Sequence, residues 1–62
     1  MKRPEYIVEF IAQGRFVKVS AIDPATGREA VLVGDARAGR DALAKEAVKK
    51  LEYLLLKGEK DG

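Results

Sequence analysis

The stretch GDARAGRD, which begins at Gly34, carries glycines and arginines in an order that could bind phosphate. Gly34 and Gly39 have the spacing of the phosphate loop G-x-x-x-x-G-K-[ST], in which backbone N–H groups surround the phosphates. Arg40 replaces the lysine, however, and Asp41 puts negative charge where a hydroxyl should meet Mg²⁺. We therefore predict a plain connection between a strand and a helix, with Asp35 or Asp41 capping the helix.

Side chains for catalysis are scarce in this chain. It has one serine, one threonine, no cysteine and no histidine, so no familiar pair of nucleophile and base can be assembled. Asp23, Asp35 and Asp41 are explained as turn residues, caps and solvated charges. We expect no catalytic residue, no metal site and no cofactor.

Cations offer an alternative function. Arg37 and Arg40 lie near an expected helix start, where free amides attract anions, and Lys18 lies on a strand. These three residues define the alternative of an anion-binding or nucleic-acid-binding domain. The charge balance favours it little, because 12 basic residues against 10 acidic ones give a net charge of only +2.

Two alternating segments, about residues 5–13 and 15–23, predict a β-hairpin. Apolar side chains recur at every second position, so each strand has one face directed at a core. A two-residue loop at Gln13 and Gly14 would join the strands. That loop sets the pairs Ala12 with Arg15, Phe10 with Val17, Val8 with Val19, Tyr6 with Ala21, Glu9 with Lys18 and Ile11 with Phe16.

The sequence DPATG, residues 23–27, predicts a turn into a third strand at about 28–34. A four-residue loop from Pro24 to Gly27 would set Ala21 opposite Ala30 and Val19 opposite Leu32. Val31 and Val33 would then lie beside Ser20 and Lys18 on the other face, although the apolar run AVLV specifies this register weakly.

From residue 38 or 40 to 57 the spacing predicts one helix, ended by Gly58. Tyr53 and Leu56 fall nearly opposite its apolar stripe, and residues 58–62 are expected to fray. The stripe consists of Leu43, Ala44, Ala47, Val48, Leu51, Leu54 and Leu55.

The predicted fold class is therefore α+β: a three-stranded antiparallel β-meander followed by one C-terminal helix packed on one sheet face, in a single domain of residues 1–62. A chain this short has a marginal core, and self-association is one common remedy. We expect a non-enzymatic interaction module that forms a homodimer or binds a protein through the uncovered sheet face. The expected interface residues are Ile7, Ile11, Phe16, Val31 and Val33, with Tyr53 and Leu56 as a possible second contact.

No apolar run approaches the roughly 18 residues that span a bilayer, so we expect no membrane partner and a cytoplasmic location. The segments FVKVSAIDPATGREAVLVG and LAKEAVKKLEYLL resemble a family of short, uncharacterised, mainly alphaproteobacterial proteins classed as a domain of unknown function. The resemblance covers about Val8 to Lys57 and consists of turn residues, alternating strands and one amphipathic helix. It implies no activity, cofactor or catalytic residue.

Overall fold

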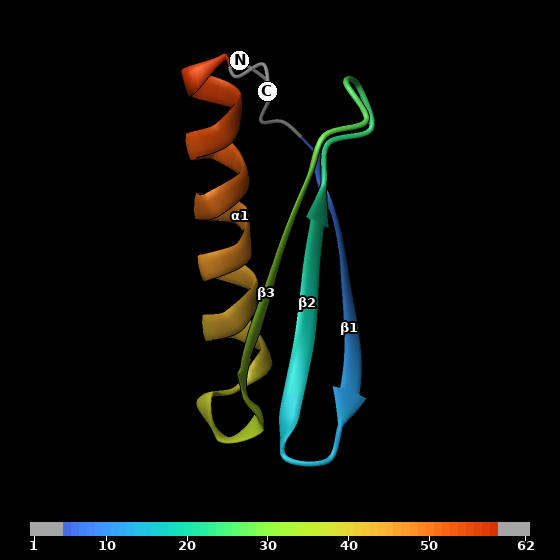
Figure 1. Ribbon diagram of the computed structural model, residues 1–62, viewed down its shortest axis with the longest axis vertical. Helices are drawn as coiled ribbons and strands as arrows, with labels where there is room; N and C mark the ends of the chain where they lie inside the picture. The colour runs from blue at the N-terminus through green and yellow to red at the C-terminus, as the bar shows by residue number, and fades with distance from the viewer. Residues whose placement is uncertain (1–4, 59–62) are drawn as a thin grey trace.

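A computed structural model describes residues 5–58 of the chain. The elements follow in the order β1 (Ile7–Gln13), β2 (Phe16–Ile22), β3 (Glu29–Asp35), the short 3₁₀-helix η1 (Ala36–Ala38) and α1 (Arg40–Lys57). The three strands form one antiparallel sheet in sequence order, and α1 lies along one side of it (Figure 1). The predicted α+β meander with one C-terminal helix is confirmed. The tail expected to fray lies, apart from Gly58, outside the described residues.

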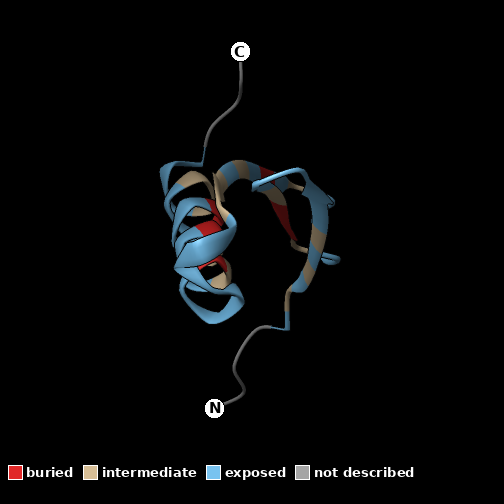
Figure 2. Cartoon of the chain, turned by 90° about the horizontal axis from the view of Figure 1, so that it is seen from below, coloured by how far each residue is buried: buried red, intermediate tan, exposed pale blue. Residues whose placement is uncertain are grey.

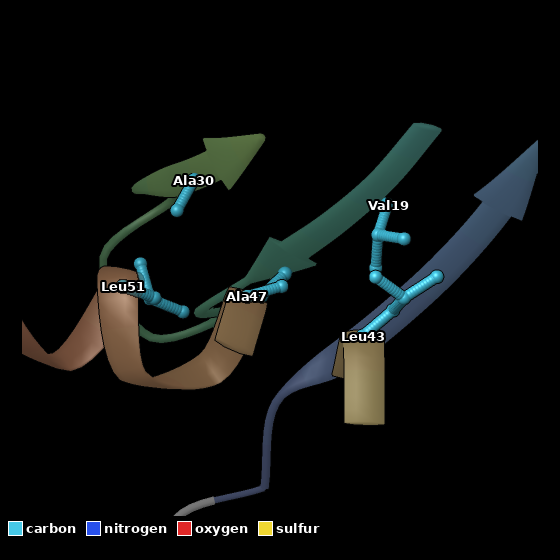
Figure 3. Close-up of a cluster of buried hydrophobic side chains, with 6 residues drawn as sticks. Val19, Ala30, Leu43, Ala47 and Leu51 are labelled. Carbon is cyan, nitrogen blue, oxygen red and sulfur yellow. The ribbon is translucent and has the colours of Figure 1, made fainter. Parts of the chain in front are cut away.

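The core is a thin layer between α1 and the sheet. Val19, Ala21 and Ala30 contribute it from β2 and β3, and α1 contributes three residues four apart, which is the spacing of one helical face: Leu43, Ala47 and Leu51. Figure 3 shows these side chains directed into the space between helix and strands. Small alanines on both sides allow α1 to approach the sheet closely.

The predicted register of the first hairpin is wrong by two residues. Gln13 pairs with Phe16, so the loop consists of Gly14 and Arg15. The predicted loop would have placed Gln13 at the first central position, which has a positive φ in the turns that suit two-residue hairpins. Gly14 occupies that position with a φ of 63°, and no other residue type among those described adopts a positive φ.

A shift of two residues keeps every side chain on its expected face, because side chains alternate with a period of two. The faces were therefore predicted correctly, while the partners across the hairpin were not. Instead of the expected pairs, the structure sets Glu9 opposite Ser20, Ile11 opposite Lys18, Phe10 opposite Val19 and Ala12 opposite Val17.

The predicted register of the third strand is confirmed: Ala21 pairs with Ala30 and Val19 with Leu32. Asp23 fixes this turn. Its side chain accepts hydrogen bonds from the Ala25 N–H at 3.0 Å and the Thr26 hydroxyl at 3.1 Å. Its main-chain carbonyl accepts one from the Gly27 N–H at 2.7 Å.

α1 begins at Arg40 and ends at Lys57, both as predicted, but the predicted cap at its start is wrong. Gly58 adopts the left-handed conformation and its N–H donates to the Leu55 carbonyl at 3.1 Å. At the other end, Asp35 caps η1 rather than α1, since its carboxylate accepts from the Arg37 N–H at 2.8 Å. The residue before α1 is Gly39, and no side chain caps that helix. Asp35, which the sequence predicts as a cap of the long helix, therefore caps the short 3₁₀-helix that precedes it.

The contact between Gly34 and Leu43 gives a test of this packing. A Cβ at Gly34 would collide with Cδ2 of the Leu43 side chain. We expect Gly34→Ala to lower the free energy of unfolding by about 1 to 3 kcal/mol, and Leu43→Ala to lower it by about 2 to 5 kcal/mol. The double variant should lose less than the sum, because the shortened side chain leaves room for the added methyl group. Denaturant unfolding of all four proteins measures this, and strictly additive losses would show that the two positions are not in contact.

Candidate interaction surface

The sheet has one side that α1 does not cover, which we call the open face. It consists of the outward-facing residues of all three strands, and Figure 2 shows that most residues of the chain apart from the helix–sheet contact are exposed or partly exposed. Its exposed large apolar side chains are Ile7, Ile11, Phe16, Val31 and Val33, with exposed fractions from 37% for Val31 to 62% for Val33. The structure therefore brings five of the seven expected interface residues onto one surface. Contiguous apolar patches of several hundred Å² on a monomer commonly mark binding sites.

The observed registers arrange the open face in rows across the strands. One row consists of Ile11, Lys18 and Val33. Lys18 is half-buried between its two apolar neighbours, so its methylene stem adds apolar surface while the ammonium group can reach water. At the hairpin end, Phe16 has Gln13 and Asp35 as neighbours across the strands.

The middle of the open face is low, because Ser20 has a short side chain. Among residues 5–58, Ser20 is the buried polar residue, and 6% of its surface is exposed. Glu9 lies opposite it on β1 and Val31 on β3. Together with Glu29 and Asp35, Glu9 places acidic groups around the apolar residues. Apolar side chains interspersed with polar and charged ones are common in protein interfaces.

Tyr53 and Leu56, the expected second contact, lie on α1 and not on the open face. Tyr53 is 59% exposed and Leu56 is 83% exposed. The Lys57 ammonium lies 5.2 Å from the centre of the Tyr53 ring, which gives that ring a partner within the helix. Leu56 helps to line a shallow hollow with Tyr6, Glu52 and Leu55. Any contact made by these two residues is separate from the open face.

The three cations of the anion-binding alternative are not gathered at one place. Lys18 lies on the open face, whereas the Arg40 guanidinium lies 4.8 Å from the ring centre of Phe10, a residue of the helix-facing side. Arg37 is bound to Asp35, with 3.3 Å between its Nη2 and a carboxylate oxygen. Dispersed cations with intramolecular partners form a poor surface for phosphates.

The aspartates expected to be structural have structural surroundings. Asp23 holds the β2–β3 turn, Asp35 caps η1, and Asp41 is exposed in the first turn of α1. Within residues 5–58, no cluster of three or more histidine, cysteine, aspartate or glutamate residues could hold a metal ion. Over the same residues, no helix is long and apolar enough to cross a membrane.

Three contacts of the helix with the strands were not foreseen from the sequence. The Tyr6 hydroxyl donates to Glu52 at 3.4 Å, Arg40 lies over Phe10, and the Lys50 ammonium donates to the main-chain carbonyl of Val31 at 2.8 Å. Burial, followed by the charge of Glu52, raises the pKa of Tyr6. All three depend on where α1 crosses the sheet, so no local signal in the sequence could have revealed them.

Fold and surface together define a small α+β domain with one apolar face uncovered and no assembled catalytic group among the described residues. Residues 3–60 match the family described as "Domain of unknown function (DUF6898)", and the chain belongs to this family. A search of curated proteins found no match, and neither did a search of solved structures.

The cap of η1 predicts a dependence of stability on pH. Hydrogen bonds from the Arg37 N–H, and then from its guanidinium, hold the pKa of Asp35 below its ordinary value, against a smaller opposing effect of burial. A lowered folded-state pKa means that the ionised form stabilises the fold above the pKa of the unfolded chain. This contribution is lost as the pH falls through the folded-state pKa.

Carboxyl chemical shifts in an acid titration should therefore place the pKa of Asp35 below that of an aspartate in the unfolded chain. Asp35→Asn should remove this part of the acid dependence of the melting temperature. A matched variant, Asp41→Asn, changes an exposed carboxylate in the first turn of α1. Normal titration of Asp35 in the folded protein would contradict the cap.

Proposed function

We propose that this protein is a non-enzymatic interaction module of the bacterial cytoplasm that self-associates, or binds another protein, through its open face. The observation that carries the proposal is the alignment of five exposed large apolar side chains on one side of a three-stranded sheet. A domain with so few buried residues gains stability when a second surface covers that side.

The shape of the open face supports a protein partner over a small molecule. Its apolar side chains come from all three strands and form a broad surface, with the low centre at Ser20. Small-molecule sites are concave and enclose most of their ligand. Two shallow hollows in the described part of the chain lie away from this face, and they are lined by residues of α1 and by Tyr6.

A double variant tests the open face. Phe16→Thr with Val33→Thr removes apolar surface from β2 and β3 while keeping residues that suit strands. Light scattering and sedimentation over a range of concentrations should show a dimer for the wild-type protein and a weaker one for the variant. The loss should be about 2 kcal/mol or more of association free energy, from the apolar area no longer buried. The melting temperature should also lose its dependence on concentration.

Leu56→Thr is the matched control, because it makes the same kind of change on α1. It should leave association unchanged. Loss of association in this control alone would assign the interface to the helix. A protein that stays monomeric, with a melting temperature that neither variant alters, would refute the role of the open face in self-association.

Nucleic-acid binding is the alternative function, and Lys18 is its most direct test. If the open face bound DNA or RNA, binding to mixed-sequence duplexes would weaken steeply with salt and with Lys18→Ala. We expect no retention on either nucleic acid at low salt, because Glu9, Glu29 and Asp35 surround the apolar residues. Salt-dependent retention that Lys18→Ala abolishes would favour the alternative instead.

A further inference from the structure

The outer edge of β1 presents main-chain groups that no described residue satisfies. Two hydrogen bonds fix which groups these are: the Asp23 N–H donates to the Arg28 carbonyl, and the Ala36 N–H donates to the Arg15 carbonyl. Odd-numbered residues of β2 therefore bond to β3, and its even-numbered residues bond to β1. Their partners on β1 are the odd-numbered residues. The N–H and carbonyl groups of Val8, Phe10 and Ala12 thus point away from β2, outward from the free edge of the sheet.

The opposite edge of the sheet is protected. By the same alternation the carbonyl of Val31 points outward from β3, and the Lys50 ammonium donates to it at 2.8 Å. Covering an edge strand with a helix is a common device against further strand pairing. In addition, α1 packs mainly on β2 and β3, so it lies nearer to this edge than to the outer edge of β1 (Figure 1).

Apart from the charge of Glu9, the usual protections of an edge strand do not occur on β1. The strand pairs without a bulge over all seven of its residues, and it contains no proline and no lysine. Glu9 is its single charged residue. Both of its sides carry apolar groups: Ile7 and Ile11 on the open face, and Val8 and Phe10 on the side that α1 leaves half-covered.

We propose that β1 pairs antiparallel with β1 of a second copy of this chain, so that two three-stranded sheets become one sheet of six strands. This contact goes beyond the open-face contact proposed above, because it uses the edge of the sheet and leaves the open face available to a protein partner. An edge with free donors and acceptors at alternate residues is complementary to itself when turned about a two-fold axis. A second copy therefore satisfies all of the outward groups at once.

Charge and length select the register of this pair. An axis at Glu9 would set two carboxylates opposite each other, which is destabilising. An axis at Phe10, the middle residue of the strand, pairs all of β1 and keeps the two Glu9 side chains apart. The resulting pairs are Phe10 with the partner's Phe10, Val8 with the partner's Ala12, Glu9 with the partner's Ile11 and Ile7 with the partner's Gln13.

Pairing at this edge changes both surfaces of the sheet. The two open faces join into one, with Ile7 and Ile11 of both copies at its centre, so the surface offered to a protein partner doubles. On the other side, the two Phe10 rings become cross-strand neighbours, each with an Arg40 guanidinium over it. Edge pairing thus assembles the open faces without covering them.

Ala12→Pro tests the pairing. Ala12 is exposed and its N–H points outward, so proline removes an intermolecular donor and no bond to β2. Ala12→Thr is the matched control, because it keeps the N–H and favours a strand. Sedimentation should give the wild-type protein and Ala12→Thr a mass of twice 6.8 kDa, and Ala12→Pro a dissociation constant at least about tenfold higher. Circular dichroism checks that the proline variant folds.

Amide hydrogen exchange of the wild-type protein is a second measurement that needs no variant. The amides of Val8, Phe10 and Ala12 should be protected in the dimer and should lose that protection on dilution. A folded Ala12→Pro variant that remains a full dimer, or rapid exchange of these three amides in the dimer, would overturn the edge pairing. A wild-type protein that is monomeric at millimolar concentration would overturn it as well.

The variants of the β1 edge and of the open face together show which of the two surfaces forms the dimer contact. Dissociation by Ala12→Pro, with Phe16→Thr/Val33→Thr still dimeric, supports edge pairing and removes the open face as the dimer contact. The opposite result retains the open face and removes the edge. Because Phe16 and Val33 lie on β2 and β3, their replacement leaves the β1 edge intact.

Discussion

The contact of one helix with one side of a three-stranded sheet is the interaction on which the rest of this structure depends. Leu43, Ala47 and Leu51 recur on one face of α1 and meet Val19, Ala21 and Ala30 of the sheet. This contact provides the fully buried apolar surface of the domain. A single helix cannot also cover the other side, so the apolar residues of the open face remain outside the intrachain core. The exposed surface is thus a direct consequence of the way in which the core is built.

The position of the helix across the sheet has a second consequence. Because α1 packs mainly over β2 and β3, it brings Lys50 to the edge of β3 and leaves the edge of β1 without cover. Tyr6 and Phe10 are partly buried beside the core, and their polar contacts with α1 are to the Glu52 carboxylate and the Arg40 guanidinium. The sheet is therefore asymmetric: one edge is closed by the chain itself, and the other has the geometry to accept a strand.

The first hairpin shows how two local rules of different strength combine. Alternation of apolar residues decides which side chains face the helix, and it is insensitive to a shift of two residues. Backbone conformation decides the shift. Gly14 can adopt a positive φ at little cost whereas Gln13 cannot, so the loop falls at Gly14 and Arg15. As a result, the face of each side chain could be predicted from alternation. The residue pairs across the hairpin could be predicted only by placing Gly14 at the turn position with a positive φ.

The sequence by itself determined the order of the elements, the faces of the strands, the turn at Asp23, the end of α1 and the exposure of the apolar residues that the helix does not cover. These features depend on local conformation or on the periodicity of apolar residues, both of which are encoded within a few neighbouring positions. Only the tertiary structure decided that Lys50 bonds to Val31 and that Arg40 lies over Phe10. Each of these depends on where α1 crosses the sheet, which is set by the packing of Leu43 against Gly34 and of small alanines against one another, and no local pattern specifies that position.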